Sequence, residues 1–325
     1  DGACLPSAGV VRGESMKLWI LHFALIAGLF AAQFLLSPYL TTQLARIMVL
    51  AVFAMGYNLA FGYTGLLSLG HALFFAAGMY AAGLLARDQG WTAGPALIAG
   101  IAAGGALAAA IGLLALRTAG VSFMIVTLMF AQAGYLTILY FGSTTGGDEG
   151  FTLPAASRTL LGFDLSTDMP RFAVALGLFA VALLVSLALV RSPFGRSMVA
   201  MRENEERSRM LGYNPFTVKL AALTFSGMYA GAAGAGYGLL FGYVGASFAT
   251  IQYSILPMLY VLLGGAGTTL GPILGAILMF ALIETASGLT SAYLFFVGAA
   301  LVALVLFAPK GILGTIRERW ARWLP

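Results

Sequence analysis

Residues 191–220 read RSPFGRSMVAMRENEERSRMLGYNPFTVKL, the longest polar run between two long apolar runs of the chain. Its charged side chains are Arg191, Arg196, Arg202, Arg207, Arg209, Lys219, Glu203, Glu205 and Glu206. The sequence on both sides has the apolar composition of membrane-spanning segments. We therefore interpret this polar segment as the contact between a membrane domain and a component of the cytoplasm.

Composition places the chain among integral membrane proteins. Hydrophobic residues make up 60% and charged residues 9%, against roughly 25% charged residues in a soluble domain. The mean hydropathy is +0.94. An all-α polytopic membrane protein with one continuous membrane domain is expected. The net charge of +5 does not indicate nucleic acid, because basic residues gather in cytoplasmic loops of membrane proteins. The single cysteine, Cys4, excludes an intramolecular disulfide and a cysteine metal cluster.

The chain divides into an extension, a membrane domain and a tail. Residues 1–15, DGACLPSAGVVRGES, differ from the rest, and Met16-Lys17 before an apolar run resembles a natural start. We expect residues 1–15 to be a non-native or disordered extension. The membrane domain is predicted at 16–314, with a cytoplasmic coupling loop at 191–219, and a cytoplasmic tail at 315–325. The apolar run that begins at Leu18 exceeds the roughly 7–15 residues of a signal peptide and predicts a first membrane span.

About 20 mostly apolar residues form a helix that crosses ~30 Å of hydrocarbon. This window predicts ten spans, at 17–36, 43–61, 66–86, 94–116, 121–141, 171–190, 217–243, 252–265, 271–288 and 291–308. Gly70-His71 interrupts the third span, and the short eighth span contains Pro257. Two inverted sets of five would place these irregular spans in corresponding positions, which is typical of a midplane pathway. The likeness between GYTGLLSLG (62–70) and GGAGTTLG (264–271) is equally consistent with chance among glycine-rich segments.

Basic residues set the expected orientation, because they concentrate on the cytoplasmic side. With loop 191–219 inside, both termini are cytoplasmic and thirteen of the 17 basic residues lie inside. The outer basic residues are then Arg46, Arg87, Arg158 and Arg171, and loop 142–170 faces outward.

Small residues recur at four-residue spacing in several spans. They are Gly100, Gly104, Ala108 and Gly112, then Gly234, Gly238 and Gly242, and then Gly267, Gly271 and Gly275. Such stripes let helix backbones approach closely in lipid, so we expect tight helix packing along them.

No catalytic or metal-binding motif is present. The sequence lacks H-E-x-x-H, G-x-S-x-G and the phosphate loop G-x-x-x-x-G-K-[ST], and neither His22 nor His71 has a metal-ligand neighbour at helical spacing. We therefore expect no catalytic residue, no metal site and no cofactor in this chain, and no ATP bound through a phosphate loop of its own.

Polar residues inside the spans are the candidates for a translocation path: Asn58, Ser68, His71, Gln132 and Glu284. Glu284 is the one acid within a helix and serves either as a proton or cation site or as a structural hydrogen-bond partner near the outer end. Gln132, near mid-depth, contacts a polar substrate or joins helices. For Asn58 and His71, near the inner ends of their spans, a structural hydrogen bond is the favoured interpretation.

The polar segment itself has the pattern of a short helix between two membrane helices. Pro193 ends the sixth span, Gly195 allows a sharp turn, residues 196–211 favour helix, and Gly212 is a helix stop. Such an element transmits force from a soluble partner, or rests on anionic headgroups as a basic helix.

The segment resembles the cytoplasmic coupling loop of ABC importer permeases, in which an acid stands six residues before a glycine, as Glu206 and Gly212 do. Asn214-Pro215-Phe216 replaces the usual apolar-Pro ending, a departure that fits branched-chain amino acid permeases of the LivM type. NLAFGYTGLLSLGHALFFAAGMYAAGLL (58–85), TGGDEGFTLP (145–154), LLGGAGTTLGPILGA (262–276) and FAPKGILG (307–314) also resemble motifs of this family. The resemblance extends from Met16 to about Gly314.

The resemblance implies an ATP-driven importer of branched-chain amino acids in the bacterial cytoplasmic (inner) membrane. This chain would pair with a LivH-type homologue, two ATPase subunits that bind ATP and Mg, and an extracytoplasmic substrate-binding protein, within membrane lipid and without nucleic acid. The residues implied at the ATPase are Gly195, Arg202, Glu203, Glu205, Glu206 and Gly212. Those implied on the binding-protein side are Gly146, Gly147, Asp148 and Glu149.

Two alternatives stay open at this point. The family includes permeases for urea and short amides, so the substrate is open. A stand-alone secondary transporter coupled to protons or cations through Glu284 is the other alternative.

Overall fold

The computed structural model describes residues 8–160, 162–289 and 311–319, with the single positions 295, 298, 299 and 302. The longer helices are α1 (Ala8–Leu35), α2 (Pro38–Asn58), α3 (His71–Asp88), α4 (Ala93–Ala115), α5 (Val121–Tyr140), α7 (Asp168–Arg191), α8 (Pro193–Glu203), α10 (Pro215–Phe241), α11 (Ile251–Gly264), α12 (Gly271–Leu289) and α14 (Gly311–Arg319). Short elements are the π-helix η1 (Leu59–Tyr63), α6 (Gly142–Thr145), α9 (Glu205–Met210), and the 3-10 helices η2 (Ala155–Ser157) and η3 (Ala246–Ala249). The strands are β1 (Phe151–Thr152), β2 (Thr159–Leu160), β3 (Phe163–Asp164) and β4 (Tyr243–Val244).

The chain is a polytopic membrane protein. Within the described residues, six helical segments are long and apolar enough to cross a membrane: Leu18–Leu35, Pro38–Tyr63, Ala93–Ala115, Val121–Tyr140, Asp168–Arg191 and Gly271–Gly288. Each of the first nine predicted spans overlaps one of the longer helices. The tenth prediction, 291–308, falls almost wholly outside the described residues.

Three boundaries differ from the sequence-based expectation. Helix α1 begins at Ala8, inside the segment 1–15 for which we expected no regular structure; residues 1–7 are not described. The third span was expected from residue 66, but α3 begins at His71, and the buried residues before it are not helical. Gly65 has φ +77°, a conformation that ends a right-handed helix. The helix expected at 196–211 is two helices, separated at Asn204.

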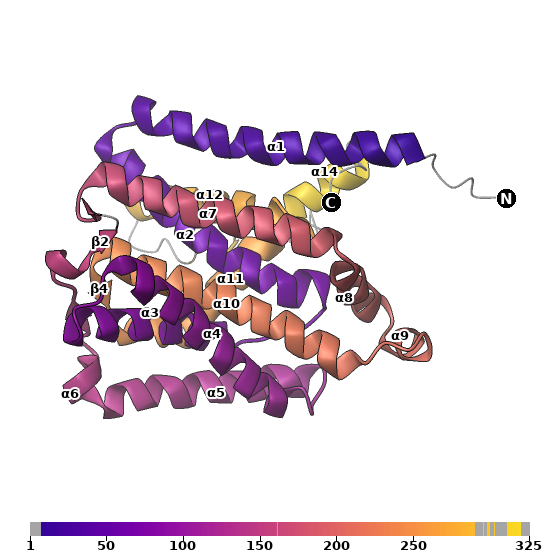
Figure 1. The fold of residues 1–325 in the computed structure, drawn as a ribbon. Helices are drawn as coiled ribbons and strands as arrows, with labels where there is room; N and C mark the ends of the chain where they lie inside the picture. Colours follow the sequence, from indigo (N-terminus) through magenta and orange to yellow (C-terminus); the bar gives the residue numbers. More distant parts are fainter. Residues whose placement is uncertain are drawn as a thin grey trace.

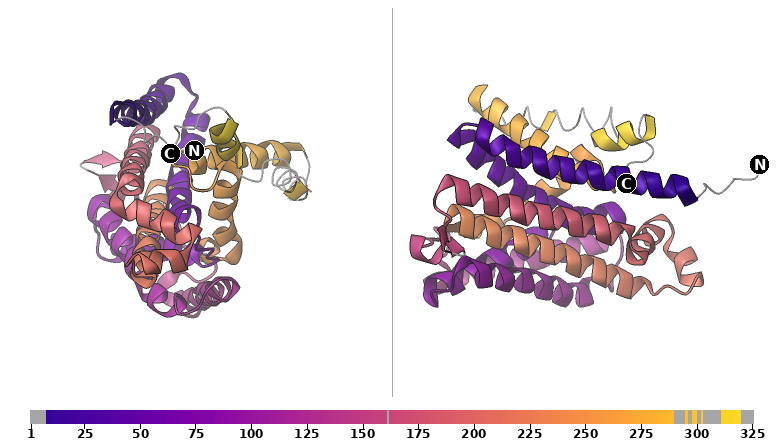
Figure 2. Two further views of the ribbon diagram at one scale, coloured as in Figure 1. Left: turned by 90° about the vertical axis from the view of Figure 1, so that its right-hand side faces the viewer. Right: turned by 45° about the horizontal axis from the view of Figure 1, so that its top comes forward.

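The helices form a bundle in which most helix axes are roughly aligned with one another (Figure 1). Helices α8 and α9 lie at one end, together with the beginning of α1, whereas α6, β2 and β4 lie at the opposite end (Figure 2). At that second end, β1 pairs with β4 and β2 pairs with β3, both antiparallel. The polar segment 191–220 and the loop 142–167 are therefore on opposite faces of the bundle.

Glycines bring α10 against α3 and α4 at backbone distance. A Cβ on Gly104 would lie 2.5 Å from the Gly227 carbonyl oxygen, and a Cβ on Gly78 would overlap the backbone of Gly231. The predicted tight packing along Gly100 and Gly104 is confirmed. Gly242 instead ends α10 in a left-handed conformation.

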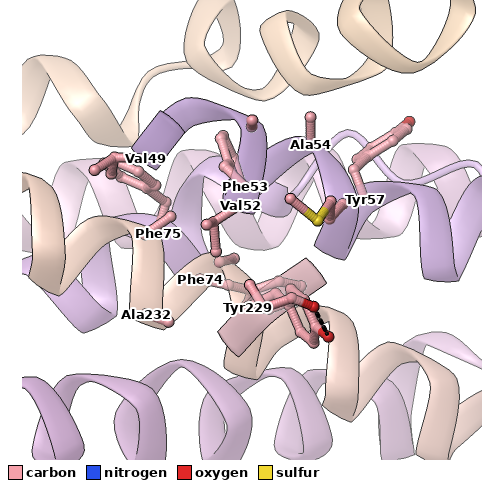
Figure 3. Packing of buried hydrophobic residues seen from close by; sticks show 14 of the residues in the cluster. Val49, Val52, Phe53, Ala54, Tyr57, Phe74, Phe75, Tyr229 and Ala232 are labelled. Atoms are coloured by element: carbon pink, nitrogen blue, oxygen red, sulfur yellow. Dashed lines mark hydrogen bonds between the residues drawn. The ribbon is translucent and has the colours of Figure 1, made fainter. Parts of the chain in front are cut away.

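Aromatic residues fill the centre of the bundle between α2, α3 and α10 (Figure 3). Phe53 and Phe75 are fully buried, with ring centroids 4.9 Å apart. The buried Tyr229 of α10 donates a hydrogen bond to the Ala182 carbonyl of α7 at 2.9 Å. These contacts hold α2, α3, α7 and α10 together. The polar sites described below lie on these helices or next to their ends.

Candidate functional site

The polar segment leaves the bundle at a sharp turn between α7 and α8. The Gly195 N–H donates to the side chain of Ser192 at 3.2 Å, which caps the start of α8. A Cβ at Gly195 would overlap the Val190 carbonyl at the end of α7. Gly195 is therefore required for this turn, as the sequence predicts. Because Gly195 is buried, we assign it a structural role in shaping the segment.

A second turn divides the segment. Asn204 adopts an extended conformation, and its side chain accepts a hydrogen bond from the Arg207 N–H at 2.9 Å, so it caps α9. After Met210 the chain ends α9 at Gly212, whose φ of +90° is left-handed. The helix stop predicted at Gly212 is confirmed.

The three acids of the segment have different surroundings. Glu205 forms ion pairs with Lys219 of α10 and with Arg209, the latter at 3.8 Å. It therefore ties α9 to α10. Glu203 and Glu206 are exposed. These two side chains are accessible to a partner, whereas Glu205 holds the segment together.

Arg202 connects α8 to two glycine-rich segments of the membrane domain. Its Nη1 donates a hydrogen bond to the Gly62 carbonyl in η1. A Cβ on Gly65 would lie 3.3 Å from the Arg202 Cγ, and one on Gly267 would lie 2.9 Å from its Nη1. The arginine thus occupies the space that glycines leave at both positions.

The same two glycine-rich segments bind each other through Asn58. Its amide donates to the Thr268 carbonyl at 2.9 Å and accepts from the Gly267 N–H at 2.9 Å. His22 of α1 adds a contact between its Nε2 and the Thr269 hydroxyl at 3.2 Å. Asn58 is 2% exposed, so its role is a satisfied structural hydrogen-bond pair.

A cavity of about 930 Å³ opens beside this junction. Its wall includes Gly65, Arg117, Arg202, Tyr213 and Lys219. Next to it, Met210 and Leu211 are 85% and 71% exposed. Exposed apolar side chains beside charged ones are typical of a surface that binds another protein.

Ser68 and His71 lie deep in the bundle at the start of α3. The His71 Nε2 lies 2.8 Å from the Ser226 Oγ of α10, and the Gly70 N–H donates to the Ser68 hydroxyl. Ser226 is eleven residues into α10, roughly 16 Å along its axis. His71 is the first residue of α3, as expected for a residue at one end of its span, but its contact lies well along α10, away from the end of the bundle that carries α8 and α9. The non-helical residues 64–70 before α3 are buried or partly buried except Gly65, which lines the cavity. Non-helical backbone in a membrane is tolerated in these two situations, buried in protein or lining a cavity.

The remaining two path candidates lie elsewhere. Glu284 of α12 accepts a hydrogen bond from the Tyr39 hydroxyl at 2.5 Å, and Tyr39 stands at the start of α2. Asn58 ends α2, roughly 30 Å further along the helix. Gln132 is partly buried on α5. The five candidates therefore do not converge on one site.

The loop 142–167 lies at the end of the bundle opposite α8 and α9 (Figure 1), and hydrogen bonds tie it to α10. Gly146 and Gly147 have positive φ, and Asp148 and Glu149 are exposed between them and β1. The Arg158 guanidinium donates to the Leu239 carbonyl at 2.8 Å and to the Leu240 carbonyl at 2.5 Å, which satisfies the end of α10.

Charges in this loop are stabilised locally. Hydrogen bonds from the Ser166 hydroxyl and N–H lower the pKa of the Asp164 carboxyl. Burial lowers the pKa of the Arg158 guanidinium, which nevertheless stays protonated at any physiological pH.

The sequence did not lead us to Arg46 as a functional residue, and it did not identify the hydrogen-bond partner of Arg202. Arg46 was counted as an outer-face charge, yet it lies inside α2, with its Cζ 5.1 Å from the Phe241 ring centroid. The signal was present, because Arg46 falls within the predicted span 43–61. The partner of Arg202 depends on tertiary structure and has no sequence signal.

Comparison with known proteins gives one family. Residues 39–307 match the family described as branched-chain amino acid transport system / permease component. The chain is 30% identical to the high-affinity branched-chain amino acid transport system permease protein LivM of Escherichia coli K12, over 95% of this chain and 78% of that protein.

Other relatives are more distant or shorter in extent. The LivH permease protein of the same E. coli system is 27% identical over 81% of this chain and 91% of its own length. The autoinducer 2 import system permease protein LsrC of Photorhabdus laumondii is 31% identical over 46% of this chain and 49% of that protein. No solved structure matches the chain.

Proposed function

The chain belongs to the family of branched-chain amino acid ABC transport system permease components, and from this premise we propose that it imports branched-chain amino acids across the bacterial inner membrane. As a member of that family it is a transport component and not an enzyme. In this proposal, ATP and Mg act in separate partner subunits. The family membership and the two relatives of the same E. coli system support this assignment.

In the proposed topology ten helices span the membrane, with both termini and α8–α9 in the cytoplasm. The end of the bundle that carries α8 and α9 also carries most of the basic residues, which supports this orientation. A five-plus-five inverted repeat is supported by the irregular spans α3 and α11, whose first turns meet where the Ala72 N–H donates to the Ser254 hydroxyl at 3.0 Å. The similar segments 62–70 and 264–271 precede α3 and α12, so their likeness does not support this register.

The observation that carries the proposed coupling is the contact of Arg202 with both glycine-rich segments. Helix α8 follows α7 after a sharp turn, and a short loop joins α9 to α10, so both ends of the segment are held by membrane helices. When an ATPase subunit displaces α8–α9, Arg202 carries that displacement to η1 and to the segment before α12. ATP hydrolysis is then linked to the arrangement of the membrane helices.

The ATPase would bind the exposed side of this segment. Glu203 and Glu206 offer exposed acids, and Met210 and Leu211 offer exposed apolar side chains. In this arrangement Gly195, Glu205 and Gly212 shape the segment, whereas Glu206 meets the partner. On the opposite side, the exposed Asp148 and Glu149 would meet the substrate-binding protein, on a loop fixed by Arg158. The second membrane subunit would be a LivH-type homologue.

A pull-down of this chain from its native membrane, followed by mass spectrometry, tests the proposal. We expect two ATPase subunits, a LivH-type permease and a substrate-binding protein in the captured complex. A chain that is captured alone, or only with copies of itself, would contradict the importer and support a stand-alone secondary transporter. Uptake by the captured complex in liposomes, with leucine, urea and acetamide compared, decides the substrate class.

A further inference from the structure

The outer half of α2 carries a polar stripe inside the membrane domain. Tyr39, Gln43 and Arg46 follow the spacing i, i+4, i+7 and share one face of the helix. Arg46 lies roughly 12 Å along α2 from Pro38 and is partly buried. A cation at this depth is costly unless something compensates it, so such a residue marks a functional site by default.

Two polar atoms of this stripe lack a hydrogen-bond partner. Both the Arg46 Nε and the Gln43 Oε1 are buried, and neither has a hydrogen-bond partner among the residues that the structure describes. No ion pair to Arg46 is found within the described part of the chain, and the acid on this face, Glu284, is engaged by Tyr39. Within the described residues, no acid neutralises the Arg46 guanidinium, and its charge is met only by the face of the Phe241 ring.

An aromatic wall stands beside Arg46. The arginine Cζ lies 5.1 Å from the Phe241 ring, and Tyr237 packs on Phe241 with centroids 4.7 Å apart. Phe248 connects Tyr237 to Tyr253, with centroids 5.1 Å and 5.0 Å apart. Tyr253 belongs to the first turn of α11, whose N-terminal end is positive through the helix dipole. The region thus combines positive potential with apolar surface.

We propose that Arg46, with Gln43 beside it, binds the carboxylate of the transported amino acid, while the aromatic wall of Phe241, Tyr237 and Tyr253 receives its aliphatic side chain. This rests on the proposed function. The guanidinium is suited to the task because its forked N–H groups match a carboxylate, and Gln43 can hydrogen-bond the zwitterion through its own amide. The cation–π contact with Phe241 holds the guanidinium in place while no carboxylate is bound.

The sharpest test is Gln43→Glu in the intact complex with its partner subunits, reconstituted with the binding protein. The new carboxylate lies one turn from Arg46 and would pair with it, which satisfies the Arg46 Nε and leaves the fold intact. We expect unchanged or higher thermal stability, unchanged ATPase activity with loaded binding protein, and about tenfold or greater loss of radiolabelled leucine uptake per ATP. A purely structural arginine predicts no loss of uptake from this variant.

Arg46→Gln and Arg46→Lys complete the test, with Arg87→Gln as the matched control. Arg87 also lies over a ring, 4.2 Å from the Phe151 centroid, but Asp88 already neutralises it. We expect Arg46→Gln to lose uptake, Arg46→Lys to retain part of it, and Arg87→Gln to transport normally.

Uptake per ATP within twofold of wild type in Gln43→Glu would overturn this proposal, whatever Arg46→Gln does to assembly. A wild-type complex that assembles but imports no leucine would instead overturn the proposed function, and this proposal with it.

Discussion

The Arg202 guanidinium of α8 donates a hydrogen bond to the backbone carbonyl of Gly62, 140 positions earlier in the chain. The acceptor belongs to η1, the π-helical turn that ends the long α2 segment. A charged donor on a backbone carbonyl is stronger than a neutral pair, and it moves with α8. Because Gly65 and Gly267 pack around the same side chain, one residue connects the polar segment 191–220 to two breaks in the membrane helices.

Arg202→Gln is expected to uncouple ATP hydrolysis from transport. The shorter neutral side chain loses the contact with Gly62 but leaves the exposed Glu203, Glu206, Met210 and Leu211 of the proposed docking surface in place. We expect normal co-purification of the ATPase and about a fivefold or greater fall in substrate imported per ATP hydrolysed, because a lost charged hydrogen bond is worth roughly 1.5–3 kcal/mol. The exposed Arg196 of the same helix provides the control, since Arg196→Gln should keep the ratio of wild type. An unchanged ratio in the Arg202 variant would refute the connection.

Glu206→Lys should prevent stable binding of the ATPase while the chain still inserts in the membrane. Glu206 is exposed, so charge reversal replaces an attraction by a repulsion at the docking face without disturbing the fold. The measurement is the amount of ATPase that co-purifies, and Glu149→Lys, on the opposite face, is the control. Glu205→Lys should behave differently and lower thermal stability, because Glu205 pairs with Lys219 and Arg209. Wild-type ATPase recovery with Glu206→Lys would contradict the docking face.

Most helices were predictable because long apolar runs and proline or glycine ends mark membrane spans directly. Pro193, Gly195 and Gly212 shape the polar segment 191–220 as their local chemistry predicts. The break at Asn204 was not predicted, since the residues around it favour helix; the extended backbone of Asn204 ends α8, and its side chain caps the start of α9. Local composition cannot decide between a helix and a capped turn when both satisfy the backbone.

The polar sites were less predictable, because their meaning depends on which helices meet. Hydropathy does not separate the non-helical residues 64–70 from the helix that follows, so the third span was predicted to begin at residue 66 and not at His71. Asn58 was correctly interpreted as a structural hydrogen-bond partner, but its acceptor at Thr268 requires the tertiary fold. Arg46 had a signal in sequence, a cation within a predicted span, whereas the aromatic wall beside it comes from α10, η3 and α11.

Asn58→Leu should destabilise the junction of the two glycine-rich segments. Leucine has a similar size but leaves the Gly267 N–H and the Thr268 carbonyl buried without partners, at a cost of about 2 kcal/mol or more. Thermal unfolding in detergent measures the effect. Gln132→Leu is the matched control, since the structure gives this partly buried amide no hydrogen bond to any described residue. Equal melting temperatures for the two variants would show that Asn58 does not stabilise the junction of the two segments.

Glu284→Gln should retain substantial uptake. The glutamine Oε1 still accepts the hydrogen bond from Tyr39, so the contact between α12 and α2 survives while the charge is lost. An ATP-driven importer needs no proton on this side chain, and uptake should also persist when a protonophore collapses the proton gradient. Tyr39→Phe removes the same hydrogen bond but keeps the acid, and it separates a structural from a protonic role. Complete loss of uptake in Glu284→Gln with normal assembly, together with sensitivity to the protonophore, would favour proton-coupled transport through Glu284. The polar segment 191–220 would then need another explanation, because a secondary transporter has no ATPase subunit that could displace α8 and Arg202.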